Sequence, residues 1–429
     1  MKTLIKGGRV IDPANNFDKQ ADVLIENDKI VAVAKNIKVI ADKIIDATNL
    51  IVVPGLIDVH THLREPGREE AETIATGTCA AAKGGFTTVL CMPNTKPALD
   101  NAPAVEFVLL KAQKEGLVNV HPIGCITRGS AGEELAEIGV LKKAGVVAIS
   151  DDGSPVSNSL VMRRALEYAK MFKLPVIAHC EDKNLAKNGV MNEGFTSTLL
   201  GLRGIPPQAE DIMVSRDVML AQLTGGHLHV AHISTAGSVD IVRQAKKKKI
   251  NVTAETCPHY FSLTDEAVKG YSTSTKMNPP LRTAADVEAI KEGLADGTID
   301  CVASDHAPHT REEKSREFDI APFGIIGLET MLSLSIMNLV DTKILSLKQL
   351  IAKFTSNPAR IFALTDRGTL SKGKRADITI IDPSKVFVAN SFISKSSNSP
   401  FLGKKLKGVA EYTIVGGKTV WSHKEGIIY

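Results

Sequence analysis

His60 and His62 stand two residues apart in the stretch DVHTHLR (residues 58–64), which follows the apolar run LIVV and a Pro-Gly step. Residues i and i+2 of an extended strand point to the same face, so the two imidazoles would meet at one point. Imidazole is a common ligand of Zn²⁺ and related metals. Arg64 continues the alternation and would place a fixed cation beside the metal. Because such a pair also occurs by chance, its interpretation depends on what the rest of the chain supplies.

Other side chains capable of chemistry stand where apolar runs end, namely Asn94, Asp151, Asp152, His179, His232 and Asp305. The segment HLHVAH offers a choice, since His227 and His229 begin it whereas His232 ends it with the opposite parity. We therefore expect His232 in the site and structural roles for the other two. One of the two adjacent aspartates could bridge two cations.

Four histidines and two aspartates exceed what one tetrahedral zinc ion needs. Two metal ions about 3.5–4 Å apart, bridged by hydroxide, would use all of them. Asp305 could ligate a metal through one oxygen and move a proton with the other. Such a pair of metals supplies a nucleophile at neutral pH and polarises a carbonyl oxygen, which is the chemistry needed to hydrolyse an amide or a related C–N bond.

Eight apolar strand candidates alternate with helical stretches, and they cover residues 51–63, 87–94, 119–127, 146–152, 175–181, 227–234, 250–257 and 299–305. This alternation predicts an α/β fold with a parallel sheet, and eight repeats predict a (β/α)₈ TIM barrel. Active sites of such barrels lie at the C-terminal ends of the strands, where the candidate residues stand.

The two chain ends instead resemble each other as short β segments separated by turn clusters. We expect them to form one small β-sandwich domain, with residues 1–53 and 368–429 as its two parts and residues 54–367 as the barrel. The polar segment 394–399 is predicted to be a long loop or a mobile stretch.

Composition excludes several classes of protein. The chain has 52 Lys and Arg against 48 Asp and Glu, a net charge of +4, which argues against a nucleic-acid-coating protein. Its six cysteines form no C-x-x-C pair and predict buried free thiols in a reducing compartment. No signal-peptide core and no convincing membrane span are visible, so we expect a cytoplasmic protein without a membrane or nucleic-acid partner.

A set of motifs follows the barrel in order: PGLIDVHTHLREPG (54–67), GFTTV (85–89), MPNT (92–95), SDDGSPV (150–156), AHCED (178–182), HIST (232–235), ETCPHY (255–260), KMNPPLR (276–282) and ASDHAPH (303–309). On these residues the chain resembles the amidohydrolase superfamily and, within it, the zinc-dependent dihydroorotases of the Asp-bridged bacterial type. The resemblance covers nearly the whole chain, including the family's composite second domain.

The resemblance implies two zinc ions per subunit, held by His60, His62, Asp152, His179, His232 and Asp305. Asp152 would be the bridging carboxylate, because its position before Gly-Ser-Pro favours it over Asp151. Asp305 would also be the catalytic general acid/base. Hydantoinases and allantoinases typically bridge their metals with a carboxylated lysine near the end of this strand, and Lys142 and Lys143 lie too early for that role.

The resemblance also implies a substrate-binding set: His62, Arg64, Asn94, Asn278, His309, Phe323 and Gly324. Arg64, Asn94 and His309 would bind a substrate carboxylate, for which the guanidinium fork is suited. Asn278 would contact an amide edge of a pyrimidine ring. Backbone groups of Phe323 and Gly324 would contact the substrate from a loop that closes over it.

The implied activity is that of a dihydroorotase, the reversible cyclisation of N-carbamoyl-L-aspartate to L-dihydroorotate and water in de novo pyrimidine (UMP) biosynthesis, with a zinc-bound hydroxide and Asp305 as general acid/base. The alternatives are another cyclic amidase (hydantoinase, dihydropyrimidinase or allantoinase) or a non-catalytic scaffold for aspartate transcarbamoylase. A homo-oligomer is expected, and an aspartate transcarbamoylase is a candidate partner. His259 and His306 are undecided between support of the site and plain packing.

Overall fold

Eight short parallel strands form a barrel in the computed structural model, which describes all residues from 1 to 429. They are β6 (Leu56–Thr61), β7 (Phe86–Cys91), β8 (Asn119–Pro122), β9 (Ile149–Ser150), β10 (Val176–Ala178), β13 (Leu228–Val230), β14 (Val252–Thr256) and β15 (Cys301–Val302). The first three and the last five pair as separate sheets. Parallel bridges from Gly124 to Ile149 and from Thr61 to His306 join these sheets and close the barrel. The predicted eight-stranded barrel is confirmed.

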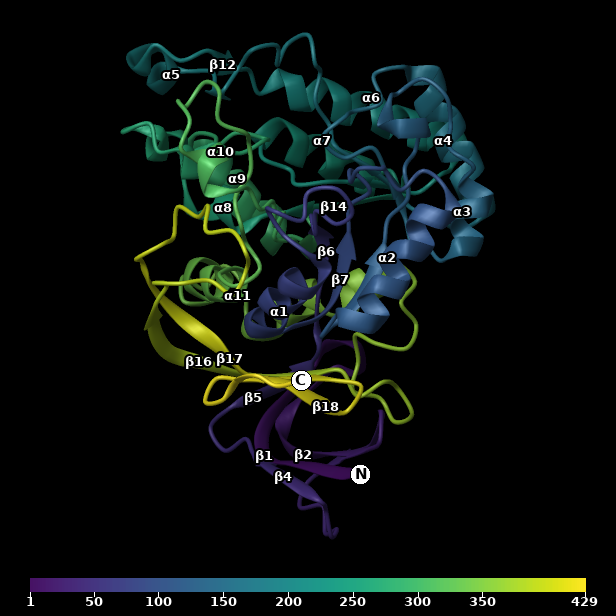
Figure 1. Cartoon of the computed structure of the whole chain (residues 1–429), viewed down its shortest axis with the longest axis vertical. Coiled ribbons are helices and arrows are strands. Elements are labelled where there is room, and N and C mark those ends of the chain that lie inside the picture. Colours follow the sequence, from purple (N-terminus) through teal and green to yellow (C-terminus); the bar gives the residue numbers. More distant parts are fainter.

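Helices cover the outside of the barrel (Figure 1). The longer ones are α1 (Ile74–Gly84), α2 (Ala102–Glu115), α3 (Ile138–Ala144), α4 (Ser159–Met171), α6 (Gln208–Thr224), α7 (Ala236–Lys247), α9 (Ala284–Ala295) and α12 (Leu347–Phe354). Local sequence explains their ends: Thr73 caps α1 by accepting from the amide of Thr76, and Gly85 ends it with a φ of 91°. None of the helices combines the length and the apolar composition that a transmembrane span needs.

Shorter elements fill the connections. They are α5 (Phe195–Leu200), α8 (Pro258–Ser262), α10 (Arg311–Lys314), α11 (Met331–Ser335), α13 (Ser356–Ile361), the strands β11 (Met191–Asn192) and β12 (Gly204–Ile205), and five helical turns, η1 (Pro13–Asn15), η2 (Arg128–Ser130), η3 (Asp265–Val268), η4 (Thr273–Thr275) and η5 (Ile336–Val340). The main apolar core holds 63 buried residues, joins the barrel to its helices and reaches Trp421 near the C-terminus.

Both chain ends contribute to a second body below the barrel in Figure 1. Its strands are β1 (Lys2–Asp12), β2 (Phe17–Glu26), β3 (Lys29–Ala34), β4 (Lys43–Asp46), β5 (Ile51–Pro54), β16 (Ile378–Val388), β17 (Lys405–Val415), β18 (Lys418–Ser422) and β19 (Gly426–Ile427). They hydrogen-bond as one sheet of nine strands in the order β19-β18-β17-β16-β5-β1-β2-β3, with β4 beside β1. The sheet has an apolar core of 14 buried residues. A small β domain built from both ends is therefore confirmed.

The first predicted strand, 51–63, is in fact two strands in two different bodies. β5 pairs with β1 and β16 in the β domain, whereas β6 pairs with β7 in the barrel. Gly55 separates them, and a Cβ there would lie 2.1 Å from Thr87 Oγ1, so the chain passes from one body to the other at a point only glycine fits. We keep the division at 53/54 and 367/368 as a proposal, and this break is the observation that supports its first boundary.

Candidate active site

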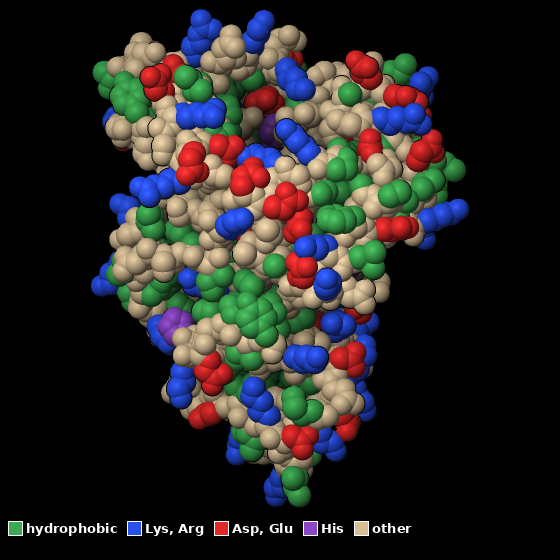
Figure 2. Space-filling model, viewed as in Figure 1, with side chains coloured by type: hydrophobic (Ala, Val, Ile, Leu, Met, Phe, Trp, Pro, Cys, Tyr) green, Lys and Arg blue, Asp and Glu red, His purple; other side chains and the backbone are tan.

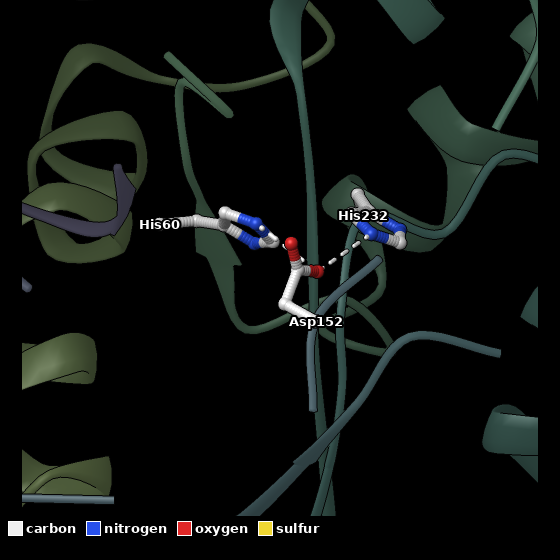
Figure 3. Close-up of side chains that lie close together, drawn as sticks. All are labelled: His60, Asp152 and His232. Carbon is white, nitrogen blue, oxygen red and sulfur yellow. Dashed lines mark ion pairs between the residues drawn. The ribbon is translucent and has the colours of Figure 1, made fainter. Parts of the chain in front are cut away.

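Asp152 lies at the centre of the residues that gather at the strand ends. Its Oδ1 is 3.5–3.7 Å from a ring nitrogen of His60, His179 and His232. Its Oδ2 is 3.4 Å from Nε2 of His62. Figure 3 shows the side chains of His60, Asp152 and His232 pointing toward one another. The second carboxylate comes from Asp305, whose Oδ1 is 3.2 Å from His62 Nε2 and 3.5 Å from His60 Nε2. All six predicted metal ligands are thus brought together.

The backbone holds two of these residues in an unusual conformation. His232 and Asp305, which both follow barrel strands, have φ angles of 32° and 45°. Residues other than glycine seldom adopt a positive φ, and each such residue costs on the order of 1–3 kcal/mol. The exit of β15 is secured by Asp58, whose carboxylate accepts a hydrogen bond from the amide of Ser304 at 3.0 Å. The barrel therefore constrains these ligands before any metal binds.

Asp151 and Asp152 have separate roles, although they are adjacent. Asp151 points away from the site and accepts hydrogen bonds from the amides of Ile126 and Thr127, at 2.8 and 3.1 Å. It holds the loop after β8 against β9. Lys142 and Lys143 are exposed in the last turn of α3, far along the chain from the strand end. Of these residues, only Asp152 faces the four histidines.

Glu255 is a residue of the site that sequence reasoning left without a role. Its Oε1 is 2.7 Å from His60 Nδ1 and its Oε2 is 3.1 Å from His229 Nε2. Burial would raise the pKa of Glu255, but the hydrogen bonds from His229 and His60 lower it to about 2, so the carboxylate stays ionised. It fixes the tautomer of His60 in which Nδ1 carries the proton and Nε2 faces the two aspartates. The only signal was its place at the start of the motif ETCPHY.

The donor atoms fit divalent metal ions. Ligand atoms of His60, His62 and Asp305 lie within 4.8 Å of one another, and so do those of His60, Asp152 and His232. His60 Nε2 and Asp152 Oδ1 are buried without a hydrogen-bond partner, which is rare for polar atoms in folded proteins. A cation between them would satisfy both. Imidazole and carboxylate donors suit zinc and other first-row metals.

A cavity of about 240 Å³ opens directly above these ligands. The whole predicted substrate-binding set lines it, namely His62, Arg64, Asn94, Asn278, His309, Phe323 and Gly324. Asn94 also orients the site, because its Oδ1 is 2.9 Å from His62 Nδ1 and its Nδ2 donates to Asp152 Oδ2 at 3.4 Å. Asn278 Oδ1 has no hydrogen-bond partner, so it is free to accept one from a bound molecule.

The backbone conformation that places Arg64 in the cavity wall differs from the expected one. β6 ends at Thr61, and Arg64 has a left-handed φ of 61°, so strand alternation does not place it. Its Nε donates to the carbonyl of Pro308 at 3.0 Å, and this bond orients the guanidinium. Burial lowers the pKa of Arg64 to about 10, which leaves it charged at neutral pH. Burial and the Arg64 charge lower the pKa of His309 to about 2, so its ring stays neutral.

The approach to this cavity is basic. A wider cavity of about 610 Å³ adjoins it, shares Asn278 and Phe323 with it, and is lined by Lys183, Lys187, Arg203 and Lys276 against Glu181 and Asp319. Figure 2 shows a hollow in the upper body with a histidine on its floor and Lys or Arg side chains around its rim. Such a surface raises the local concentration of anions.

His259 and His306, which the sequence left undecided, both lie outside the cavity lining. His306 Nε2 is 3.2 Å from Glu72 Oε2, and its Nδ1 accepts from the amide of Gly327 at 3.2 Å. It therefore ties the loop after β15 to neighbouring segments. His259 is buried with its ring centroid 4.2 Å from that of Tyr260.

Comparisons with known proteins agree with this geometry. Residues 49–238 match the family model described as dihydro-orotase-like, and residues 322–421 match that of the amidohydrolase family. The chain is 66% identical over 423 residues to a dihydroorotase of Endomicrobium trichonymphae, with 98% of this chain and 100% of the relative covered. It is 58% identical to a dihydroorotase of Geotalea daltonii, with 98% and 99% covered.

Solved structures with the same fold carry other names. An L-hydantoinase (dihydropyrimidinase) from Arthrobacter aurescens matches with a TM-score of 0.90 and 25% identity, covering 100% of this chain and 97% of that one. A dihydropyrimidinase from Brevibacillus agri matches with a TM-score of 0.87 and 25% identity, covering 99% and 96%. Sequence identity is thus much higher to the dihydroorotases than to these barrels. The chain belongs to the dihydroorotase family of metal-dependent amidohydrolases.

Proposed function

We propose that the protein interconverts N-carbamoyl-L-aspartate and L-dihydroorotate, a step of pyrimidine biosynthesis. The observation that carries this proposal is the partly buried guanidinium of Arg64 in the wall of a cavity whose floor is the cluster of histidines and aspartates. A cation that is partly withdrawn from water is stabilised by an anionic partner, and a carboxylate on the substrate supplies one. Hydantoin, dihydrouracil and allantoin lack that carboxylate.

We propose that His60, His62, Asp152, His179, His232 and Asp305 would hold two zinc ions. When bound, such a pair supplies Lewis acidity toward the amide carbonyl and acidifies a water molecule. The residues around it do the rest. Asn94 and Glu255 orient two of the imidazoles, and the second hydrogen bond of each ring fixes which nitrogen faces the cations.

Asp305 is the proposed proton carrier. Burial would raise its pKa, but the neighbouring His60 and His62 hold it below the usual range, so the carboxylate is ionised and able to accept a proton. In ring opening it takes a proton from the attacking water and delivers it to the ring nitrogen as the C–N bond breaks. In ring closure it takes the proton of the ureido nitrogen and gives it to the departing oxygen.

Arg64 and His309 would hold the substrate carboxylate, while Asn278 would contact the ring amide. The loop around Phe323 and Gly324 lies over the cavity and would exclude bulk water from the reversible step. Water is a product of ring closure and a reactant in ring opening. With bulk water excluded, the single reacting water molecule would keep a defined position.

The deciding experiment is turnover by purified, zinc-supplemented protein. We expect interconversion of N-carbamoyl-L-aspartate and L-dihydroorotate, and no comparable activity on hydantoin, dihydrouracil or allantoin. Arg64→Met should lower kcat/KM for the carboxylated substrate by about 10²-fold, the scale of losing a charge-assisted hydrogen bond and leaving its partner unpaired. Activity on the uncharged rings alone would refute the proposal.

We further propose a homo-oligomeric protein of the cytoplasm, with an aspartate transcarbamoylase as a candidate partner because that class of enzyme makes the carbamoylated substrate. Sedimentation of the protein alone and of a mixture with the transcarbamoylase tests both assemblies. A wild type that binds zinc but turns over only in the mixture would show that the partner is required.

A further inference from the structure

Four of the six residues of the polar segment 394–399 are buried, whereas Lys395 and Ser397 are exposed. Ser394, Ser396, Asn398 and Ser399 are only 5–6% exposed. Ser394 Oγ donates to Glu72, and Ser396 Oγ donates to the carbonyl of Ala71 at 2.7 Å. The segment, which lies between β16 and β17 of the β domain, is thus fastened against the barrel near the mouth of the cavity.

Asn398 uses this position to join two loops of the cavity. Its Oδ1 accepts from the amide of His309 at 3.2 Å. Its Nδ2 donates to the carbonyl of Ala307 at 3.0 Å and to that of Gly324 at 3.1 Å. Its backbone carbonyl accepts from the amide of Ile326 at 3.0 Å. Each side-chain atom able to form a hydrogen bond is used, and one loop bears His309 while the other bears Phe323 and Gly324.

The two loops touch so closely that a change in one displaces the other. Gly324 has a φ of 121°, and a Cβ there would lie 2.8 Å from the Cβ of Ala307 and 3.2 Å from His309 Nε2. The ring of His309 also contacts the carbonyl of Phe323 at 2.7 Å. The two loops are therefore in direct contact. The Asn398 side chain, which hydrogen-bonds to both of them, spans the distance between them.

We propose that Asn398 is a positioning residue that sets the spacing of the carboxylate-binding wall, although it touches no substrate. This inference rests on the proposed function, since it concerns how that function's substrate is held. It assigns to the β domain a direct part in substrate binding, because Asn398 belongs to a segment between two of its strands. The proposed metal ligands lie within or just after barrel strands, and Asn398 forms no hydrogen bond with them.

The test is a steady-state comparison of Asn398→Ala and Asn398→Ser with the wild type, using L-dihydroorotate. A displacement on the order of 1 Å can cost up to about 10²-fold, and lost ground-state binding appears in KM rather than in kcat. We expect KM to rise at least about tenfold in the alanine variant and less in the serine variant, which keeps one hydroxyl. Bound zinc should be unchanged, and kcat should change by less than about threefold.

Hydrogen exchange gives a readout that does not need turnover. The amide of His309 should exchange faster in the alanine variant, because it loses its acceptor on Asn398. Asn390→Ala, an exposed asparagine on the same connection, is the matched control and should leave both KM and exchange unchanged.

A KM within twofold of the wild type in both Asn398 variants would overturn the proposal, whatever happens to their melting temperatures. Wild-type protein inactive on both carboxylated substrates would instead refute the proposed function.

Discussion

Asp152 contacts all four site histidines, and Asp305 contacts two of them from the other side. Both carboxylates line the cavity. They differ in their neighbours, because Asp152 is surrounded by four imidazoles and Asp305 by two. The proton-transfer role of Asp305 is therefore a proposal that rests on its fewer contacts with the histidines.

Replacing Asp305 by Asn should reduce turnover by about 10²–10⁴-fold, the usual contribution of a positioned acid/base. The amide keeps the shape and one oxygen donor but cannot carry the proton. Turnover and bound zinc should be measured on the same sample, because a loss of zinc would mean that ligation failed instead. Asp240→Asn changes an exposed carboxylate in the same way and should have full activity.

Replacing Glu255 by Gln should weaken zinc binding by about 10- to 100-fold, as expected when the partner of a metal-ligating histidine loses its charge. The variant retains the shape of the side chain, so the barrel should still form. Competition with a chelator measures the effect. Zinc retention equal to that of the wild type would show that Glu255 only fills space.

At this scale, the sequence identified the residues that the structure gathers at the strand ends but missed those that support them. The ligands could be found because each stands at the end of an apolar run, where the barrel exposes polar groups. Glu255 and Asn398 act through other residues, and nothing in local pattern marks a buried glutamate or asparagine as a partner of a distant group. Arg64 was placed correctly for a wrong reason, since the backbone turns after Thr61.

The loop elements around the cavity depend on buried hydrogen bonds more than on apolar packing. Lys314, at the end of α10, is 8% exposed and donates to the carbonyls of Pro322 and Gly324 at 2.9 and 3.0 Å. Together with Asn398 it satisfies backbone carbonyls of the loop that bears Phe323 and Gly324. Polar composition predicted a long loop or a mobile stretch at 394–399, and the structure has a loop there. Carbonyls inside a crowded cavity mouth need donors, and that need accounts for the burial of four of its side chains.

Lys314 should give the protein a measurable dependence on pH. Burial and the nearby Lys276 lower its pKa from 10.5 to about 7. Between about pH 7 and 10.5 the unfolded chain keeps a proton that the folded chain has lost, so the free energy of unfolding rises with pH, by at most about 1.4 kcal/mol per unit.

Lys314→Met removes this contribution. Its melting temperature should therefore fall further behind that of the wild type as pH increases from about 7.5 to 9.5. Lys404→Met, at an exposed position, should follow the wild type. A constant difference between Lys314→Met and the wild type across this range would contradict the assignment.

At the scale of the element, pattern located the strands and helices but overestimated strand length. The predicted strand 146–152 is hydrogen-bonded as β9 only at Ile149–Ser150, and 299–305 only as β15 at Cys301–Val302. An apolar run indicates which residues are buried, not which are hydrogen-bonded as a strand. In this barrel many buried residues lie before or after the hydrogen-bonded part of each strand. The Pro54-Gly55 step ends the apolar run 50–53 and marks the predicted boundary at 53/54, but the strand prediction 51–63 continued across it.

The barrel and the β domain are not independent units. Thr413 Oγ1 donates to the carbonyl of Ala82, and Thr379 Oγ1 donates to that of Gly85, both at 2.6 Å. Trp421 belongs to the same apolar core as the barrel. The hydrogen bonds of Asn398 to His309, Ala307 and Gly324 cross this boundary as well.

Deletion of residues 368–429 should therefore leave a barrel that does not fold cooperatively. It would expose the end of α1 and one side of β5 that the C-terminal strands now cover. Circular dichroism melting of the truncated and full chains makes the comparison. A sharp transition in the truncated protein near the wild-type temperature would show that the barrel is self-sufficient.

The position of β5 between β1 and β16 has a consequence for biosynthesis. A protein is made from its N-terminus, so the first five strands of the shared sheet emerge long before their partner β16 does. The nascent chain must carry an unpaired β5 edge until more than three hundred further residues have been translated. Exposed strand edges invite aggregation, so chaperone binding at this edge during translation is the expected safeguard.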